Sequence, residues 1–346
     1  MTHDFCRRIS NSYKFTNING VLNYQPCCHI PPKGPINSKK DLELIQESFA
    51  KDINDNKEKL CNECLKRENF EFELSLRGKA NRFIPKEANE NDAYILEFQL
   101  DTKCNAACVI CTPTLSSLWR KELDIIDTEK KLDYKDVLSL VNLTNLKQIK
   151  FVGGEPLLGS THADILKEIP HPETVMVGYH TNGSIFPNND VLDIWKKFKE
   201  VKVIVSVDGI NECFEYIRWP LGWHKVEKNI IKMLDYRKYN IQSSIHCTIN
   251  PLNAFYFDKL EEWAYRHNVP ITISPCYGTW GIDVTPSELR DVLIKKYGTT
   301  HNITRMLLAN KESKHKRSTL IENLNYLDKK RNISWKRVFH DIEKYI

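Results

Sequence analysis

The 346-residue chain has no apolar run of about 18 residues, so we expect no transmembrane helix. Its first ten residues, MTHDFCRRIS, also lack the apolar stretch of a secretory signal. We therefore expect a cytoplasmic protein. No basic stripe with interleaved aromatic side chains accompanies the net charge of +5, so the charge suits a mildly basic surface and requires no nucleic-acid partner.

Cysteine, in contrast, is abundant. Eleven cysteines in a chain expected to stay in a reducing compartment indicate metal ligands rather than disulfides. Three of them, Cys104, Cys108 and Cys111, stand in the segment DTKCNAACVICTP. Three others are isolated and fit small buried apolar side chains: Cys213, Cys247 and Cys276.

The segment DTKCNAACVICTP lacks a fourth cysteine. A structural zinc site usually closes with four ligands, often in paired knuckles. A [4Fe–4S] cluster is normally held by four cysteines, so three of them leave one iron open to another ligand. Ala106 and Ala107 would let the loop approach such a cluster without crowding.

Strand-like and helix-like segments alternate from about residue 93. Strands are predicted at 93–100, 146–154, 173–183, 201–209, 241–250 and 269–275, and helical patterns between them at 189–200, 224–238 and 254–267. Such alternation predicts βαβ units and a parallel sheet. We expect an α/β fold, a partial (β/α)6 barrel of TIM type, with an open doubly wound sheet as the alternative.

The unusual residue runs follow these strands. The cysteine segment follows the first, and GGEP, HTNG, SVDG and TINPLN end the next four. In parallel α/β folds the active site lies at the carboxyl edge of the strands. The sequence therefore predicts one site at this edge.

The cysteine segment, followed in order by GGEP and SVDG, resembles the radical SAM superfamily over roughly residues 93–280. The resemblance implies a [4Fe–4S] cluster on Cys104, Cys108 and Cys111 whose free iron binds S-adenosylmethionine (SAM). One electron, from a donor such as a flavodoxin or ferredoxin, then cleaves SAM to methionine and a 5′-deoxyadenosyl radical. The resemblance and the rim position together indicate these SAM-binding residues: Gly153, Gly154, Glu155, Asn182, Ser206, Asp208, Arg218 and Asn250.

Two of these residues, Glu155 and Arg218, carry charges opposite to those of the ammonium and carboxylate groups of SAM. The Glu155 carboxylate can accept a hydrogen bond from the SAM ammonium, and Arg218 can pair with its carboxylate. The resemblance implies that the ribose is contacted from SVDG, by Ser206 alone or by Ser206 and Asp208. The simpler alternatives are a helix cap for Glu155 and a surface ion pair for Arg218.

Residues 1–90 have turn-rich stretches and weak periodicity, so a metal would supply stability that a small core cannot. Their cysteine order resembles the auxiliary-cluster modules called SPASM and twitch. That resemblance implies a second [4Fe–4S] cluster on Cys6, Cys27, Cys61 and Cys64. Cys28 is the substitute for Cys27. Zinc at the same thiols, or no metal, remains the alternative.

We thus expect three parts: an auxiliary module at 1–90, the radical SAM barrel at 91–280 and a charged helical extension at 281–346. The expected reaction is hydrogen abstraction from a peptide or protein side chain, with the auxiliary cluster assisting oxidation or bond formation. A carbohydrate or nucleotide-type small molecule is the alternative substrate. A non-enzymatic iron–sulfur redox or sensor protein is the alternative of another class, which the SAM-like rim disfavours.

Overall fold

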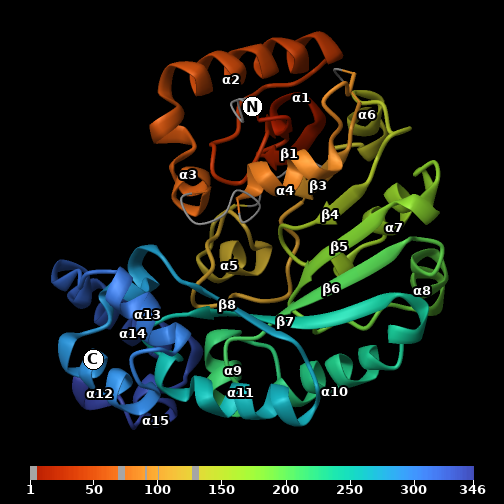
Figure 1. Ribbon diagram of the computed structural model, residues 1–346. Helices are drawn as coiled ribbons and strands as arrows, with labels where there is room; N and C mark the ends of the chain where they lie inside the picture. Colours follow the sequence, from red (N-terminus) through yellow and green to blue (C-terminus); the bar gives the residue numbers. More distant parts are fainter. Residues whose placement is uncertain (1–5, 69–74, 90–91, 100, 127–131) are drawn as a thin grey trace.

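The computed structural model describes the chain except residues 1–5, 69–74, 90–91, 100 and 127–131 (Figure 1). In this described part, no helix is long and apolar enough to cross a membrane. Eight described strands form one sheet in the order β2-β1-β3-β4-β5-β6-β7-β8, in which only β1 and β2 pair antiparallel. They are β1 (Ser12–Ile18), β2 (Val21–Gln25), β3 (Ile95–Gln99), β4 (Gln148–Phe151), β5 (Met176–Thr181), β6 (Glu200–Ser206), β7 (Ile241–Ile249) and β8 (Ile271–Pro275).

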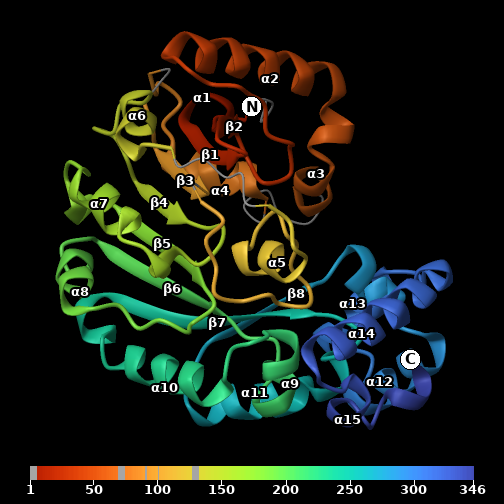
Figure 2. The same cartoon turned by 180° about the vertical axis from the view of Figure 1, so that it is seen from behind.

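The six strands expected from the sequence correspond to β3 through β8, which confirms the parallel α/β fold. Figures 1 and 2 show the sheet curving as a partial barrel, with helices following its outer, convex side. These helices are α6 (Tyr134–Ser139), α7 (Thr161–Lys167), α8 (Asn189–Trp195), α10 (Trp223–Leu234) and α11 (Phe257–Arg266). The inner, concave side is therefore the side that remains for a ligand.

Aromatic side chains fill the space between the sheet and its outer helices. Phe151 stacks on Phe98 at 6.0 Å and on Tyr179 at 5.0 Å, and Tyr179 packs against Trp195 of α8 at 4.9 Å between ring centres. Successive side chains of a strand point to opposite faces. The residues one position before these strand aromatics therefore face the concave side: Glu97, Lys150 and Gly178.

The N-terminal segment contributes a hairpin that the sequence analysis did not predict. β1 and β2 are joined by Asn19 and Gly20, both at positive φ, and the Gly20 N–H donates to Asn17 Oδ1 at 2.8 Å. β1 then pairs in parallel with β3, so this segment extends the barrel sheet. The boundary at residue 90 stays a prediction. The described part of this segment also contains four helices: α1 (Arg8–Asn11), α2 (Lys39–Leu60), α3 (Asn62–Glu68) and α4 (Leu76–Phe83).

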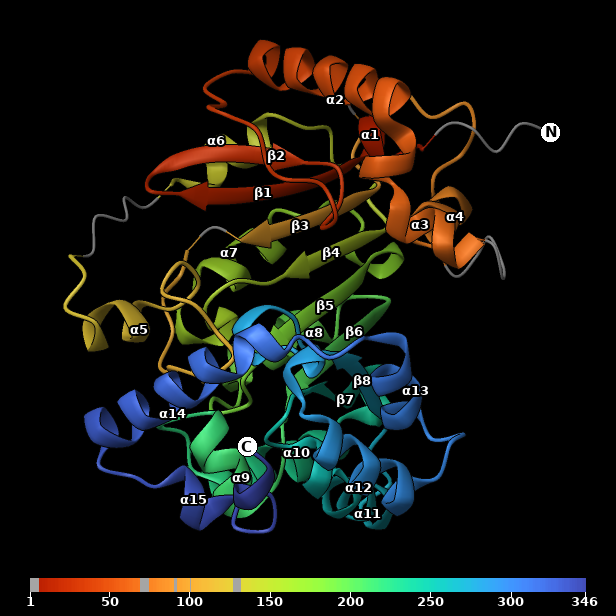
Figure 3. The same cartoon turned by 90° about the vertical axis from the view of Figure 1, so that its left-hand side faces the viewer.

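The C-terminal extension is helical, as expected. Figure 3 shows its helices gathered at the end of the molecule opposite α2, with α14 running past the loop that leads to α5 (Ser117–Glu122). The extension comprises α12 (Ser287–Tyr297), α13 (Asn302–Ala309), α14 (Arg317–Arg331) and α15 (Trp335–Val338).

Candidate functional site

The cysteine loop, residues 101–116, connects the carboxyl end of β3 to α5. Two backbone N–H groups fix its shape: Ala107 donates to the carbonyl of Trp219 and Val109 to that of Ile217, both at 2.7 Å. These carbonyls lie at and just after the end of α9 (Asn211–Ile217). The loop is therefore held by the segment that also contains the predicted site residue Arg218.

An arginine of the C-terminal extension holds the same loop from the other side. Arg331 Nη2 donates to the Ala107 carbonyl at 2.8 Å, and its Nε pairs with Glu122 at 2.8 Å. The guanidinium also lies over the Trp119 ring, 4.8 Å from its centre. The Arg331 side chain is 1% exposed. Sequence reasoning missed this residue, because nothing marks one arginine in a charged helix as a partner of a distant loop.

The glycines of GGEP bring the end of β4 against the cysteine loop. The Glu155 N–H donates to the Lys103 carbonyl at 2.7 Å. A Cβ on Gly154 would lie 2.2 Å from that same carbonyl oxygen, and Gly153 has a φ of +114°. Both positions thus require glycine for the close approach of two loops.

The Glu155 carboxylate is buried and hydrogen-bonded within the protein. Its Oε1 accepts from Thr181 Oγ1 at 2.7 Å and from the Leu157 N–H at 3.1 Å, and its Oε2 accepts from the Asn182 N–H at 2.7 Å. Burial raises the pKa of Glu155 and these three bonds oppose the rise. Three of about four acceptor sites are used. The cap considered as the alternative is present, at the start of η2 (Pro156–Leu158).

Asn182 connects the end of β5 to the cysteine loop. Its Nδ2 donates to Asn105 Oδ1 at 2.9 Å and lies 3.9 Å from the Cys104 sulfur. Asn105 in turn donates to Ser184 Oγ at 2.9 Å. Glu155 accepts a hydrogen bond from the Asn182 N–H, and the Asn182 side chain in turn lies against the Cys104 sulfur. Glu155 therefore influences the surroundings of Cys104 through these two successive contacts.

Arg218 and Asp208 form a buried ion pair beside Cys108. Arg218 Nε lies 2.5 Å from Asp208 Oδ2, although neither atom has an aligned hydrogen bond. Asp208 Oδ1 accepts from the Thr248 N–H at 2.8 Å, and Arg218 Nη1 lies 3.8 Å from the Cys108 sulfur. This pair is buried, unlike the surface ion pair considered as the alternative, and it places a cation against the loop.

The two remaining predicted rim residues differ in position. Ser206, the last residue of β6, is half-buried at the same edge. Asn250 is fully buried, and its Oδ1 accepts from the N–H groups of Leu252 and Asn253 at 3.0 and 3.3 Å. Its Nδ2 donates to the Thr248 carbonyl at 3.2 Å. The Asn250 amide therefore shapes the turn after β7.

The three thiols of the cysteine loop lie in surroundings that disfavour a free thiolate. Burial raises the pKa of Cys104 to about 12 and that of Cys111 to about 11. It also raises the pKa of Cys108, against the opposing effect of Arg218. Bound iron would supply the missing positive charge, so the donor set fits a metal centre.

Across the described residues, no three Cys, His, Asp or Glu side chains are grouped so that they could hold one metal ion.

The structure brings the predicted N-terminal cysteines into one neighbourhood. Burial raises the pKa of Cys6 to about 12, and the nearby Cys27 and Cys61 add to the rise. Burial likewise raises the pKa of Cys27 to about 11, with additions from Cys28 and Cys64. Cys28 is the exposed member of the five.

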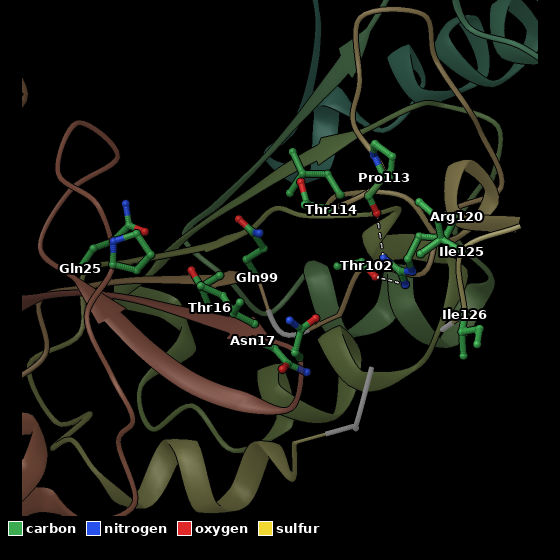
Figure 4. A pocket seen from close by; sticks show the side chains of 14 residues that line it. Thr16, Asn17, Gln25, Gln99, Thr102, Pro113, Thr114, Arg120, Ile125 and Ile126 are labelled. Atoms are coloured by element: carbon green, nitrogen blue, oxygen red, sulfur yellow. Dashed lines mark hydrogen bonds between the residues drawn. The ribbon is translucent and has the colours of Figure 1, made fainter. Parts of the chain in front are cut away.

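A cavity of about 530 Å³ lies between the N-terminal hairpin and the flanks of the cysteine loop (Figure 4). Its polar lining is uncharged apart from Arg120, which donates to the Pro113 carbonyl at 3.0 Å and to Thr102 Oγ1 at 2.6 Å. Within the described structure, the buried Thr16 hydroxyl has no hydrogen-bond partner. This cavity could not be predicted from the sequence, because β1 and β2 are not among the predicted strands.

No protein-family model matches the chain. An uncharacterised protein of Methanocaldococcus jannaschii is 24% identical over 181 residues, 50% of this chain and 59% of that protein. The GTP 3′,8-cyclase of Clostridium perfringens is 25% identical over 187 residues, 47% of this chain and 54% of the enzyme. The 7-carboxy-7-deazaguanine synthase of Clostridium acetobutylicum is 31% identical over 86 residues, 25% of this chain and 36% of the enzyme. The chain thus spans less than two thirds of the length of each.

The solved structures that are similar to the chain include the following two. The protein anSMEcpe with bound AdoMet aligns with a TM-score of 0.41 at 18% identity, over 63% of this chain and 60% of its own. SuiB of Streptococcus suis, bound to its precursor peptide SuiA, aligns with a TM-score of 0.40 at 10% identity, over 93% of this chain and 70% of its own. Both similarities concern the fold.

Proposed function

We propose that this chain, a distant homologue of radical SAM enzymes, reductively cleaves SAM and uses the resulting radical to abstract hydrogen from a substrate. The observation that carries the proposal is the cysteine loop at the rim of a curved parallel sheet, with Asn182 and Arg218 directed at two of its sulfurs. A [4Fe–4S] cluster on Cys104, Cys108 and Cys111 would supply the electron that breaks the sulfonium bond to the 5′ carbon.

The residues around the loop have distinct roles in this proposal. Arg218 keeps its charge at the loop because buried Asp208 is its counter-ion, and its guanidinium is the group offered to the SAM carboxylate. Glu155 holds the backbone of Asn182 and has one acceptor site left for the SAM ammonium. Gly153 and Gly154 keep that carboxylate close to the cysteine loop.

A second cluster at Cys6, Cys27, Cys61 and Cys64 is also proposed. Its support is that these thiols lie close enough to influence one another and that their order resembles the SPASM and twitch modules. Such a cluster would accept an electron from the substrate radical or anchor the substrate, and a flavodoxin or ferredoxin would supply electrons to the catalytic cluster.

For the substrate we propose a peptide or protein side chain. This proposal rests on the auxiliary cysteine set, whose order resembles the SPASM and twitch modules. A nucleotide-type small molecule is the second candidate, favoured by the names of the relatives from Clostridium. A non-enzymatic iron–sulfur carrier needs no SAM pocket, so the GGEP and SVDG segments at the rim disfavour that alternative.

Iron analysis of anaerobically purified protein tests the two-cluster proposal. We expect about eight irons per chain, since two four-iron clusters are proposed. Replacing Cys61 and Cys64 by Ala should leave about four irons, and replacing the exposed Cys28 should leave about eight. About four irons and one zinc in the unmodified chain would refute the second cluster and leave the catalytic one in place.

A further inference from the structure

A row of charged side chains crosses the concave face of the sheet. Lys14 of β1 stands opposite Glu97 of β3, and Glu97 stands opposite Lys150 of β4. Paired strands lie about 4.8 Å apart, and residues in register share a face. The three side chains are therefore neighbours on the side of the sheet that no outer helix covers.

The charges in this row do not cancel. Lys14 Nζ lies 2.9 Å from a Glu97 oxygen, and both side chains are less than one fifth exposed. Lys150 is half-buried, and its ammonium makes no hydrogen bond or ion-pair contact with any described residue. Arg8, also close by, adds a further positive charge. Arg8 also lies near Cys6 and Cys27, where the proposed second cluster would supply its counter-charge. The row itself thus carries an excess of one positive charge.

The other groups near Lys150 do not supply a counter-charge. They are the ammonium of Lys79, the thiol of Cys28 and the imidazole of His180. Burial lowers the pKa of Lys150, which is the direction expected of an ammonium that lacks a partner. Leaving such a group unpaired costs free energy, so an unpaired one on a concave face indicates a ligand.

Lys150 lies beside a position without a side chain, and a cavity lies further along the same face of the sheet. The next residue in register after Lys150 is Gly178 of β5, which has no side chain to cover the ammonium. A Cβ on Gly178 would lie 3.2 Å from Lys150 Cγ. Thr16 and Gln99, two residues further along β1 and β3 on the same face, line the 530 Å³ cavity (Figure 4).

We propose that Lys150 binds a carboxylate group of the substrate on the concave face of the sheet. The proposal rests on the proposed function and adds the charge of the substrate to it. A single carboxylate matches the single excess charge of the row. A nucleotide triphosphate brings three or four negative charges and is usually held by several cations or Mg²⁺. The acidic side chain of a peptide carries one carboxylate, so it is the substrate group that matches the row.

Carbon-13 methylation of the lysines in the full-length, cluster-loaded protein gives a direct test. Methylation keeps the charge of each ammonium. The resonance of Lys150 is identified by its loss in Lys150→Arg, and that of the exposed Lys40 by its loss in Lys40→Arg. The probes are sodium acetate, its neutral isostere acetamide and inorganic phosphate, all without SAM.

Acetate should shift the Lys150 resonance at a concentration about tenfold lower than the concentration at which it shifts the Lys40 resonance. Acetamide should not shift the Lys150 resonance at that lower concentration. Glu97→Gln, which removes the one carboxylate of the row, should lower the acetate concentration needed. An equal response of the two lysines, or an equal effect of acetamide, would overturn the inference. Tighter binding of phosphate than of acetate would overturn the carboxylate assignment. Because no SAM is present, failure of SAM cleavage would not change these results.

Discussion

A single carboxylate, Glu155, organises the site at the scale of residues. It holds the backbone N–H of Asn182, whose amide lies against Cys104. The sequence predicted that Glu155 belongs to the site. It could not predict that the carboxylate would already have three donors, because those donors come from Thr181, Asn182 and Leu157 in the folded chain.

Glu155→Gln should weaken SAM binding by roughly ten- to a hundredfold, since a hydrogen bond to a charged group contributes about 1.5–3 kcal/mol. Iron content should not change, because the thiols remain. The measurement is a titration of SAM against the reduced cluster, followed by electron paramagnetic resonance. The exposed Glu173→Gln is the matched control. Equal affinity in Glu155→Gln and in the control would reduce Glu155 to a helix cap.

His162 gives a pH dependence of stability. Burial lowers its pKa from 6.5 to about 4, and its Nδ1 lies 2.8 Å from the Tyr179 hydroxyl. The unfolded chain therefore binds this proton at a higher pH than the folded chain does. The stabilisation is present above pH 6.5 and is lost as the pH falls toward 4. Between pH 7 and 4.5, the free energy of unfolding in urea should fall by about 2 kcal/mol less for His162→Gln than for the native chain. Parallel losses would contradict this role.

At the scale of elements, helix α14 stabilises the cysteine loop through Arg331. Replacing Arg331 by Met leaves the Glu122 carboxylate, 12% exposed, and the Ala107 carbonyl without their partner. We expect a loss of about 3–5 kcal/mol in the free energy of unfolding and faster iron release to a chelator. Arg337→Met, whose side chain is 73% exposed, is the control. The idea fails if the two variants behave alike.

The elements differ in how well the sequence predicts them. The strands β3 to β8 could be predicted because short apolar runs end in glycine and polar residues, as in FVGGEP and SVDG. The hairpin of β1 and β2 was missed, although Asn19-Gly20 between two apolar segments is a typical turn signal. The surrounding turn-rich segments with several cysteines are more typical of a metal-binding module than of strands in a sheet.

At the scale of the whole molecule, the sequence indicates the rim but not the contacts that join distant segments to it. Arg331 and Ala107 are 224 residues apart, and the row of Lys14, Glu97 and Lys150 requires three strands in register. Local patterns carry no information on such pairings, because register depends on how complete strands pack. The candidate site could therefore be proposed from the sequence, whereas its supporting contacts could not.

The most direct test of the account is the formation of 5′-deoxyadenosine from SAM by the reduced, cluster-loaded protein. The unmodified chain should form it, and the variant with Cys104, Cys108 and Cys111 all replaced by Ala should not. That variant should keep about four irons in its N-terminal segment, because the two cysteine sets lie in separate parts of the chain. Formation of 5′-deoxyadenosine by the triple variant, or none by an unmodified protein that carries its iron, would contradict the account.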